Sequence, residues 1–530
     1  MKFRNWHIVF IFSIFGWNCL TAQSKHSKEF KKILKEADYF FDLDDFKNAE
    51  AKYMSIWKED SLDDKINFHL AVCKFKLKQM PQTVLKYLQR ADKSSRIEVQ
   101  YYEGKLYHLT HRFDEAIEHY LLYKKNPEAR REVNDMEIDR LINISKRAAE
   151  MMSHPHKAAI KNLGGNINTQ YDEYVPLISS DEKTLFFTSR RPNGVGNKTD
   201  AYGKYYEDVY ISEFKNEHWE TPKNLGTPIN TETHDACVAV SLDLQQMIIY
   251  RTSPDGLSGD LYHSEVSATG WSEPTKFGVE INSEFREYSA TFNIENNIIY
   301  FSSDRPGGLG GKDIYRVVKL PNGKWSIPWN LGPNVNTQFD EDAPFLQIDG
   351  TTLYFSSKGH ETMGEYDVFK TTINEDNQFS KAENLGFPIN TVGDDIFFVL
   401  GADGRHGYYS SLNEVESETG FESEDIYQID MRYSEGDIKV RKGLSIDASN
   451  NHPLSTKITL INSETNKIEG VYSSAAGSGK FIFVVNPYYY YKLIVDAKDY
   501  ETRIIELHPL VENNEDVEDI SELKISLTKK

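Results

Sequence analysis

The chain has 530 residues, which at roughly 150 residues per domain corresponds to about three or four domains, and it can bury several hydrophobic cores without disulfides or metal ions. Its 61 basic and 81 acidic side chains give a net charge of −20, so the chain repels phosphate backbones and nucleic acids are excluded as partners. Aromatic residues make up 13% of the sequence, a share that excludes an intrinsically disordered chain.

The first 22 residues have the pattern of a secretory signal peptide. Lys2 and Arg4 precede a short apolar stretch, and Ala22 supplies the small residue expected before a cleavage site. The apolar stretch is shorter than the roughly 20 residues that a membrane-spanning helix needs. We therefore expect export to the periplasm and no membrane span in the mature chain. Lipidation of Cys19 and retention of the segment as an anchor are the two alternatives.

Residues 23–152 contain helical repeats of 33 or 34 residues. Three columns of side chains recur at this spacing: Ala37, Ala71 and Gly104; Ala49, Thr83 and Ala116; Tyr53, Tyr87 and Tyr120. Small residues where paired helices touch, with an aromatic residue four positions after the second, are what tetratricopeptide repeats require. The segment resembles that family over about three repeats, with a capping helix over 135–151. An ordinary helical bundle is the alternative.

Residues 153–436 repeat with a period of about 54 residues. One column has an apolar residue, Asn and Thr or Ser: 167–169, 229–231, 281–283, 335–337 and 389–391. A second column begins with an aspartate that precedes an apolar and an aromatic residue: Asp208, Asp260, Asp313, Asp367 and Asp425. Each copy contains about four short strands separated by turn residues. Five copies of four strands predict a five-bladed β-propeller.

The fifth copy lacks the strand with which the others end. The missing strand is found before the first copy, because residues 156–164 align with 218–226. We therefore expect the segment 157–161 to form the outer strand of the fifth blade and to pair with a strand near 425–430. Such pairing closes the ring and leaves no bare strand edges.

Residues 437–530 alternate in a different way and contain five or six predicted strands, among them 443–447, 458–460 and 491–495. The segment resembles a carboxypeptidase-regulatory-like β-sandwich. The whole chain is therefore expected to be a multidomain α plus all-β protein, with a signal peptide at 1–22, helical repeats at 23–152, a propeller at 153–436 and a sandwich at 437–530.

Several motifs of the propeller segment match a known family. The sequences Asn-Leu-Gly at 224–226, Ser-Asp-Arg-Pro-Gly-Gly at 303–308 and Trp-Ser-Ile-Pro at 325–328 resemble the WD-repeat-like, TolB-like propeller of Bacteroidetes envelope proteins. The order of helical repeats, propeller and sandwich resembles the OmpA-type envelope proteins, which include the peptidoglycan-linked component of type IX secretion. The OmpA-like domain of that family does not follow before Lys530, so we expect no direct binding to peptidoglycan.

The resemblance implies a non-enzymatic scaffold, periplasmic or associated with the outer membrane, in type IX secretion or envelope integrity. Its expected partners are envelope proteins that bind the helical repeats and the propeller face. A glycan or peptide sensor that uses the propeller face is the alternative. A hydrolase with an unrecognised site is a remote one.

The sequence contains no pattern of a known catalytic, metal or cofactor site. It has no Gly-x-Ser-x-Gly elbow, no His-Glu-x-x-His and no Cys-x-x-Cys. His108 and His111 have a helical spacing that can share a metal, but no third ligand is near them in the sequence. Cys73 and Cys237 fall in different domains and form no disulfide framework. We expect no catalytic residue, no metal and no cofactor.

An acidic residue follows each Asn of the first column by five positions. These residues are Glu173, Asp235, Glu287, Glu341 and Asp395. Equivalent positions of a propeller form a ring, and a ring of carboxylates at a channel mouth attracts cations or basic peptides. Alternatively, each acid pairs with the backbone or with a base such as Arg190 or Arg305 and holds the blades together.

Overall fold

The computed structural model describes residues 26–530, apart from short gaps. The gaps are 92–95, 127–132, 157–158, 201–202, 242–243, 255, 257, 269, 294, 375, 402–403, 405, 413–422, 432–438, 464–465, 467, 475–478, 486–488, 510, 513–514 and 517–522. The predicted signal peptide and Cys19 lie outside the described residues. Within the described ranges, no helix is long and apolar enough to cross a membrane.

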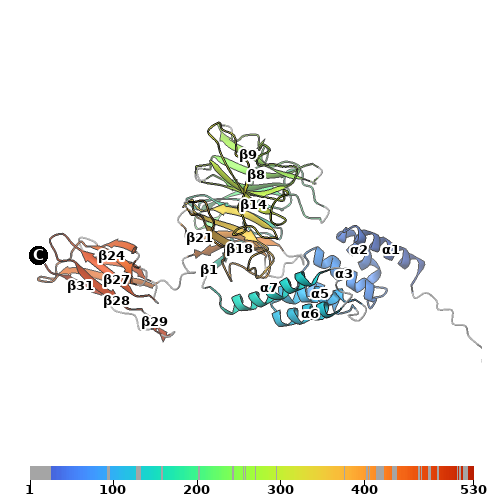
Figure 1. The fold of residues 1–530 in the computed structure, drawn as a ribbon, viewed down its shortest axis with the longest axis horizontal. Coiled ribbons are helices and arrows are strands. Elements are labelled where there is room, and N and C mark those ends of the chain that lie inside the picture. The colour runs from blue at the N-terminus through green and yellow to red at the C-terminus, as the bar shows by residue number, and fades with distance from the viewer. Residues whose placement is uncertain are drawn as a thin grey trace, which may run out of the picture.

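Seven helices make up the N-terminal part that the structure describes, and each packs against the next (Figure 1). They are α1 (Lys28–Asp42), α2 (Phe46–Trp57), α3 (Asp64–Lys76), α4 (Pro81–Leu88), α5 (Glu98–Leu109), α6 (Phe113–Lys125) and α7 (Asp135–Ser153). Ser27, Asp45, Asp63 and Asn134 cap four of the helix starts with side-chain oxygens. We call α1–α7 the helical array.

The repeated columns form the core of the helical array. Six of the nine column residues are at most 1% exposed: Ala37, Ala49, Tyr53, Ala71, Ala116 and Tyr120. The other three are Thr83, Tyr87 and Gly104. At Gly104 a Cβ atom would lie 2.6 Å from the ring of Tyr120, so this helix contact requires a residue without a side chain. The columns that the sequence displays are therefore the helix-to-helix contacts.

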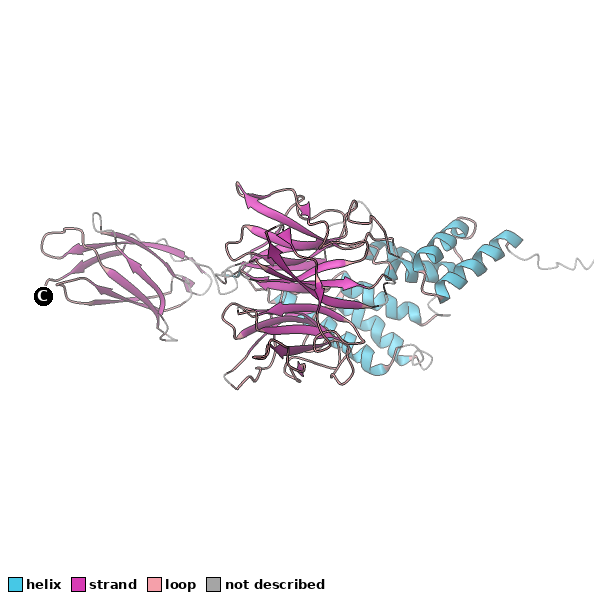
Figure 2. Ribbon diagram, turned by 90° about the horizontal axis from the view of Figure 1, so that it is seen from above, coloured by secondary structure: helices cyan, strands magenta, loops and turns pink. Residues whose placement is uncertain are grey.

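Five antiparallel sheets follow (Figure 2). The first contains β2 (Glu173–Ile178), β3 (Thr184–Ser189), β4 (Asp208–Lys215), β5 (His218–Trp219) and β6 (Lys223–Asn224). The second contains β7 (Asp235–Val240), β8 (Gln246–Thr252), β9 (Gly259–Ser267), β10 (Gly270–Trp271) and β11 (Thr275–Lys276). The third contains β12 (Glu287–Phe292), β13 (Ile298–Ser303), β14 (Asp313–Val318) and β15 (Trp329–Asn330). The fourth contains β16 (Glu341–Leu346), β17 (Thr352–Ser357), β18 (Asp367–Thr372) and β19 (Glu383–Asn384).

The fifth sheet joins the two ends of the propeller segment. It contains β20 (Asp395–Leu400), β21 (His406–Leu412), β22 (Glu424–Asp430) and β1 (Ala159–Asn162) in order. Strand β1 runs antiparallel to β22, with Ala159 opposite Asp430. The innermost strands β2, β7, β12, β16 and β20 contact one another in a closed circle, as in a β-propeller. The predicted pairing of 157–161 with the strand near 425–430 is confirmed for residues 159–161, and the strand also includes Asn162. Residues 157–158 lie outside the described residues.

The C-terminal part contains two larger sheets around one apolar core. Strands β26 (Lys480–Val485), β23 (Lys439–Asp447) and β31 (Leu523–Leu527) form one, and β25 (Ile468–Ser473), β24 (Lys457–Asn462), β27 (Tyr491–Asp496) and β28 (Arg503–Leu507) form the other. Both contribute to a cluster that includes Phe483, Ile525, Leu460 and Leu493. The short strands β29 (Val511–Glu512) and β30 (Glu515–Asp516) pair separately.

Candidate functional site

The five predicted acidic residues occupy equivalent positions, each at the first residue of an innermost strand, and all are 0% exposed. Each accepts hydrogen bonds from the backbone N–H and the hydroxyl of the Thr or Ser four residues earlier. The N–H bonds, from Thr169, Thr231, Ser283, Thr337 and Thr391, measure 2.5–3.1 Å. In four copies the acid also accepts from a serine at the end of the neighbouring strand, at 2.5–2.8 Å. These contacts orient each carboxylate toward the sheet to which it belongs.

Three of these carboxylates also pair with an arginine. Arg305 lies 2.9 Å from Glu287, as one interpretation of the sequence expects, and Arg251 contacts Asp235 in the same way. Arg191, and not Arg190, pairs with Glu173 at 3.2 Å. Burial raises the pKa of Glu173 and of Glu341 to about 7. The contacts favour the interpretation in which each acid pairs with the backbone or with a base, and cation binding by this ring stays a prediction.

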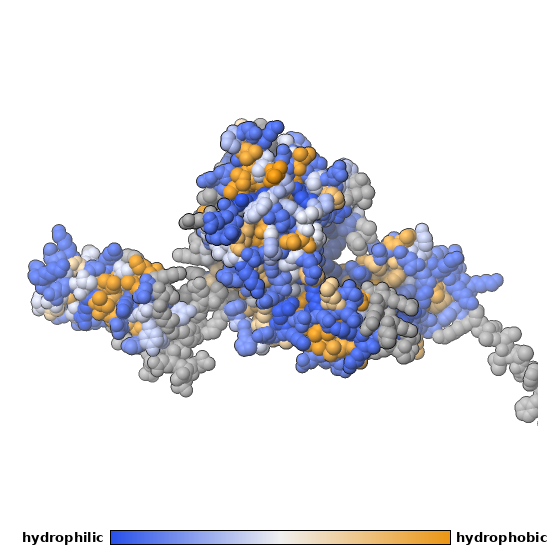
Figure 3. Space-filling view, viewed as in Figure 1, coloured by the Kyte–Doolittle hydropathy of each residue, from blue (hydrophilic) through white to orange (hydrophobic). Residues whose placement is uncertain are grey.

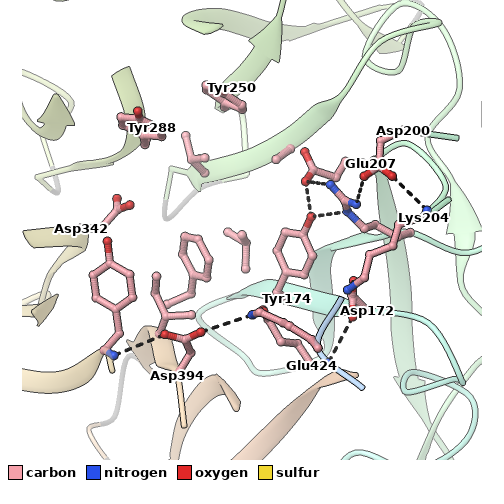
Figure 4. A pocket seen from close by; sticks show the side chains of 18 of the residues that line it. Asp172, Tyr174, Asp200, Lys204, Glu207, Tyr250, Tyr288, Asp342, Asp394 and Glu424 are labelled. Carbon is pink, nitrogen blue, oxygen red and sulfur yellow. Dashed lines mark hydrogen bonds and ion pairs between the residues drawn. The ribbon is translucent and has the colours of Figure 1, made fainter. Parts of the chain in front are cut away.

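A cavity of about 580 Å³ lies next to these acids, at one end of the circle of innermost strands (Figure 4). We call this end of the circle the channel mouth. Its wall includes the residue that directly follows each buried acid: Tyr174, Ala236, Tyr288, Asp342 and Ile396. Lys76, Leu77 and Lys78, at the end of α3, line it from the helical array. The cavity is therefore built from the innermost strands of all five sheets and from one helix end.

Ion pairs surround the cavity. Arg190 donates to Asp200 at 2.8 Å and to Glu207 at 3.0 Å. Across the first sheet, Lys204 donates to Asp172 at 2.6 Å. On the opposite wall Lys312 donates to Asp342 at 2.6 Å. The Lys312 ammonium also lies 3.9 Å from the ring centre of Tyr288. Each of these bases faces a carboxylate.

Lys78 brings the helical array into this network. Its ammonium lies 3.4 Å from Asp394 and 3.9 Å from Glu424, both on the fifth sheet or just before it. Burial raises the pKa of Glu424, the nearby Asp172 and Asp394 carboxylates add to the rise, and Lys78 opposes it. Lys78 thus brings a positive charge from the helical array to a cluster of three carboxylates, Asp172, Asp394 and Glu424. The propeller contributes Lys204 to the same cluster.

Aromatic rings form a further part of the cavity wall. Tyr174 and Phe397 are nearly parallel, with ring centres 6.2 Å apart and planes 19° apart. Tyr250 and Tyr288 form a second near-parallel pair, at 6.4 Å and 13°. Figure 4 shows Tyr174, Tyr250 and Tyr288 around an open centre. Aromatic walls with a few fixed polar groups are typical of ligand pockets.

The segment 358–365, between β17 and β18, docks against the helical array. Arg147 of α7 donates to the carbonyl of Thr362 at 2.8 Å, and Lys105 of α5 lies 3.2 Å from Glu365. Met363 is 0% exposed and packs with Ala148 of α7 in an apolar cluster. The Lys105 ammonium holds the pKa of Glu365 at about 2. The propeller and the helical array therefore share a packed, charged interface.

The histidine and cysteine candidates lie in structural surroundings. His108 is buried, its Nδ1 lies 3.0 Å from the hydroxyl of Ser145, and burial lowers its pKa to about 4. Cys73 and Cys237 are buried thiols without a disulfide. Neither histidine of the 108–111 pair belongs to a group of three metal-ligating side chains among the described residues.

No protein-family model and no curated protein matches the chain. Solved structures are similar at low identity. A putative TolB from Agrobacterium tumefaciens is 15% identical, with a TM-score of 0.28, and the match covers 51% of this chain and 96% of that one. An α-L-arabinofuranosidase from Lactobacillus brevis is 12% identical, with a TM-score of 0.32, and the match covers 49% and 92%. The β-propeller domain of the Trilobed protease from Pyrococcus furiosus is 10% identical, with a TM-score of 0.25, and the match covers 65% and 97%. Matches at this level carry no conclusion on activity.

The repeated columns of the sequence identify the acids but not the residues beside them. The acid is Glu or Asp in every copy, because each sheet needs it for the same hydrogen bonds. The following residue is Tyr, Ala, Tyr, Asp or Ile, and it lines the cavity. A position that changes between copies while its surroundings repeat is the signal that could have identified the cavity wall.

Proposed function

We propose that the protein is a non-enzymatic scaffold of the bacterial envelope that holds protein partners on its helical array and propeller face. The observation that carries this proposal is the interface between 358–365 and the helical array. Buried Met363, the Lys105–Glu365 ion pair and the Arg147 hydrogen bond fix two interaction domains relative to each other. A fixed geometry between binding surfaces is what a scaffold needs.

The finer assignments belong to the same proposal. The helical array is a set of tetratricopeptide repeats, the five sheets are the blades of a propeller closed by β1, and the C-terminal sheets are a carboxypeptidase-regulatory-like sandwich. The protein acts in the periplasm or at the outer membrane, in type IX secretion or envelope integrity. The order of the domains and the signal-peptide pattern support this placement.

The helical array offers an apolar surface to a partner. Leu121 and Leu122 of α6 are 41% and 42% exposed, and Figure 3 shows an apolar area over α5 and α6. Exposed apolar side chains that lie together are typical of protein interaction sites. We propose this surface as the place where an envelope protein binds the helical array.

Affinity purification of the full chain from solubilised envelopes, with quantitative mass spectrometry, tests the proposal. We expect one envelope protein in near-stoichiometric amount, lost from a Leu121→Glu, Leu122→Glu double variant. Leu62→Glu is the matched control, because Leu62 is 79% exposed elsewhere in the helical array. Recovery of no partner above background contradicts the scaffold.

A further inference from the structure

One wall of the channel-mouth cavity departs from the repeat. Tyr250 of β8 occupies the position where the other four sheets carry a small hydroxyl residue. Those residues are Thr188, Ser302, Ser356 and Ser410, each 0% exposed. Only in the second sheet does this position place a large side chain at the cavity.

A second departure in the same copy makes room for that ring. Gly259 precedes Asp260, whereas the same position in the other copies is Glu207, Lys312, Tyr366 or Glu424. A Cβ atom at Gly259 would lie 2.2 Å from the Tyr250 hydroxyl. The second copy therefore has no side chain at Gly259, and the aromatic ring of Tyr250 lies in the space beside it.

The Tyr250 hydroxyl is available to a ligand. The hydroxyls of Tyr174 and Tyr288 donate to Glu207 and Asp304. Tyr250 is half-buried, and its hydroxyl makes no hydrogen bond within the part of the chain that the structure describes. A half-buried tyrosine hydroxyl usually has a partner, so this one indicates that the partner is a bound molecule or solvent.

The charges of the cavity argue for a neutral ligand. Asp172, Asp342 and Glu207 each lie within 3.0 Å of a lysine or arginine nitrogen. A charged ligand at these three carboxylates would have to separate such a pair, and leaving a partly buried charge unpaired is costly. The carboxylates of Asp394 and Glu424 share the Lys78 ammonium. A carboxylate has about four lone-pair sites, so a ligand hydroxyl can add a hydrogen bond while the ion pair stays intact.

We propose that this cavity binds a short neutral oligosaccharide. A sugar ring has an apolar C–H face, which packs on Tyr250, and an edge of hydroxyls, which bond to the Tyr250 hydroxyl and the paired carboxylates. The volume of about 580 Å³ is within the usual range for small-molecule sites. Binding here goes beyond the scaffold function and does not depend on it.

Titration calorimetry of the full chain tests the proposal with four neutral trisaccharides: cellotriose, xylotriose, maltotriose and N,N′,N″-triacetylchitotriose. We expect at least one to bind with a Kd below about 1 mM. Because the ligand is neutral, its Kd should change less than about twofold between low and high salt. Trilysine and trigalacturonic acid are the charged comparisons and should bind more weakly.

Variants of Tyr250 locate the binding. Tyr250→Ser introduces the residue found at this position in three other copies and should weaken binding at least about tenfold. Tyr250→Phe keeps the ring, preserves the packing if the serine variant fails to fold, and should weaken binding about threefold or more through loss of the hydroxyl. Tyr39→Ser is the control, since Tyr39 is 62% exposed on α1. Failure of all four neutral sugars to bind, tighter binding of a charged probe, or equal binding by both Tyr250 variants and the native chain overturns the proposal.

Discussion

Truncation of Met363 to alanine should loosen the interface between the helical array and the propeller. Met363 is 0% exposed and packs with Ala148, Val392 and Met151. A Met→Ala change at a fully buried site costs about 2–5 kcal/mol. Because 358–365 is a connecting segment that can partly collapse into the space, we expect about 2–3 kcal/mol.

Hydrogen exchange of the full chain measures this loss locally, which is needed because unfolding of a multidomain chain is not a single transition. The Met363 and Gly364 amides donate to Asp367 at 2.8 and 3.1 Å and report on the docked segment. A loss of about 2–3 kcal/mol corresponds to exchange roughly 30- to 150-fold faster.

Met136→Ala is the matched control for this prediction. Met136 lies on the same helix α7 but is 68% exposed, so its truncation should change exchange in 358–365 by less than about 0.5 kcal/mol. Equal effects of the two truncations would refute the reasoning that Met363 holds the interface.

Three further predictions concern single contacts. Glu365 has its pKa lowered from 4.5 to about 2 by Lys105, so its contribution to docking should be complete above about pH 4.5 and fall away as the pH drops toward 2. With its side chain 40% exposed we expect about 1 kcal/mol, and Glu365→Gln should remove this pH dependence of exchange. Gly104→Ala should destabilise the helical array by about 1–3 kcal/mol, measured by hydrogen exchange of α5 and α6, because the new Cβ meets the Tyr120 ring. Gly165→Ala, with no atom within 4 Å, should be neutral, and equal exchange in the two variants would contradict the packing argument. Asn162→Ala should destabilise the propeller by about 1–3 kcal/mol, measured by hydrogen exchange of β1 and β22, since Asn162 donates to Asp425 at 2.8 Å where β1 closes the ring; unchanged exchange there would mean that this closure is unimportant.

The repeats made much of the propeller predictable, because each copy makes the same local hydrogen bonds. The Asn of the first column illustrates this: Asn336 accepts from the Ile314 amide at 2.8 Å and donates to the Ile314 carbonyl at 3.0 Å. The same pair of bonds recurs at Asn168, Asn230, Asn282 and Asn390. Because this pair of bonds recurs in every copy, the Asn that makes it recurs at the same position of every repeat.

The contact between the helical array and the propeller is harder to predict from the sequence. The fourth copy replaces the glycine-rich loop of the third with Lys358-Gly359-His360, and these residues begin the segment 358–365 that contacts α5 and α7. Lys105 and Glu365 are 260 positions apart, and neither residue lies in a pattern that points to the other. A pairing of this kind occurs once in the molecule, so it produces no repeated pattern in the sequence.

A double-mutant cycle between Lys105 and Glu365 tests most directly whether the two interaction domains are held together. Lys105→Ala, Glu365→Ala and the double variant are compared by hydrogen exchange of 358–365 in the full chain. Residues whose charged atoms lie 3.2 Å apart should show a coupling energy of about 1 kcal/mol or more. Additivity within about 0.3 kcal/mol would contradict the docked arrangement, and with it the observation on which the scaffold proposal rests.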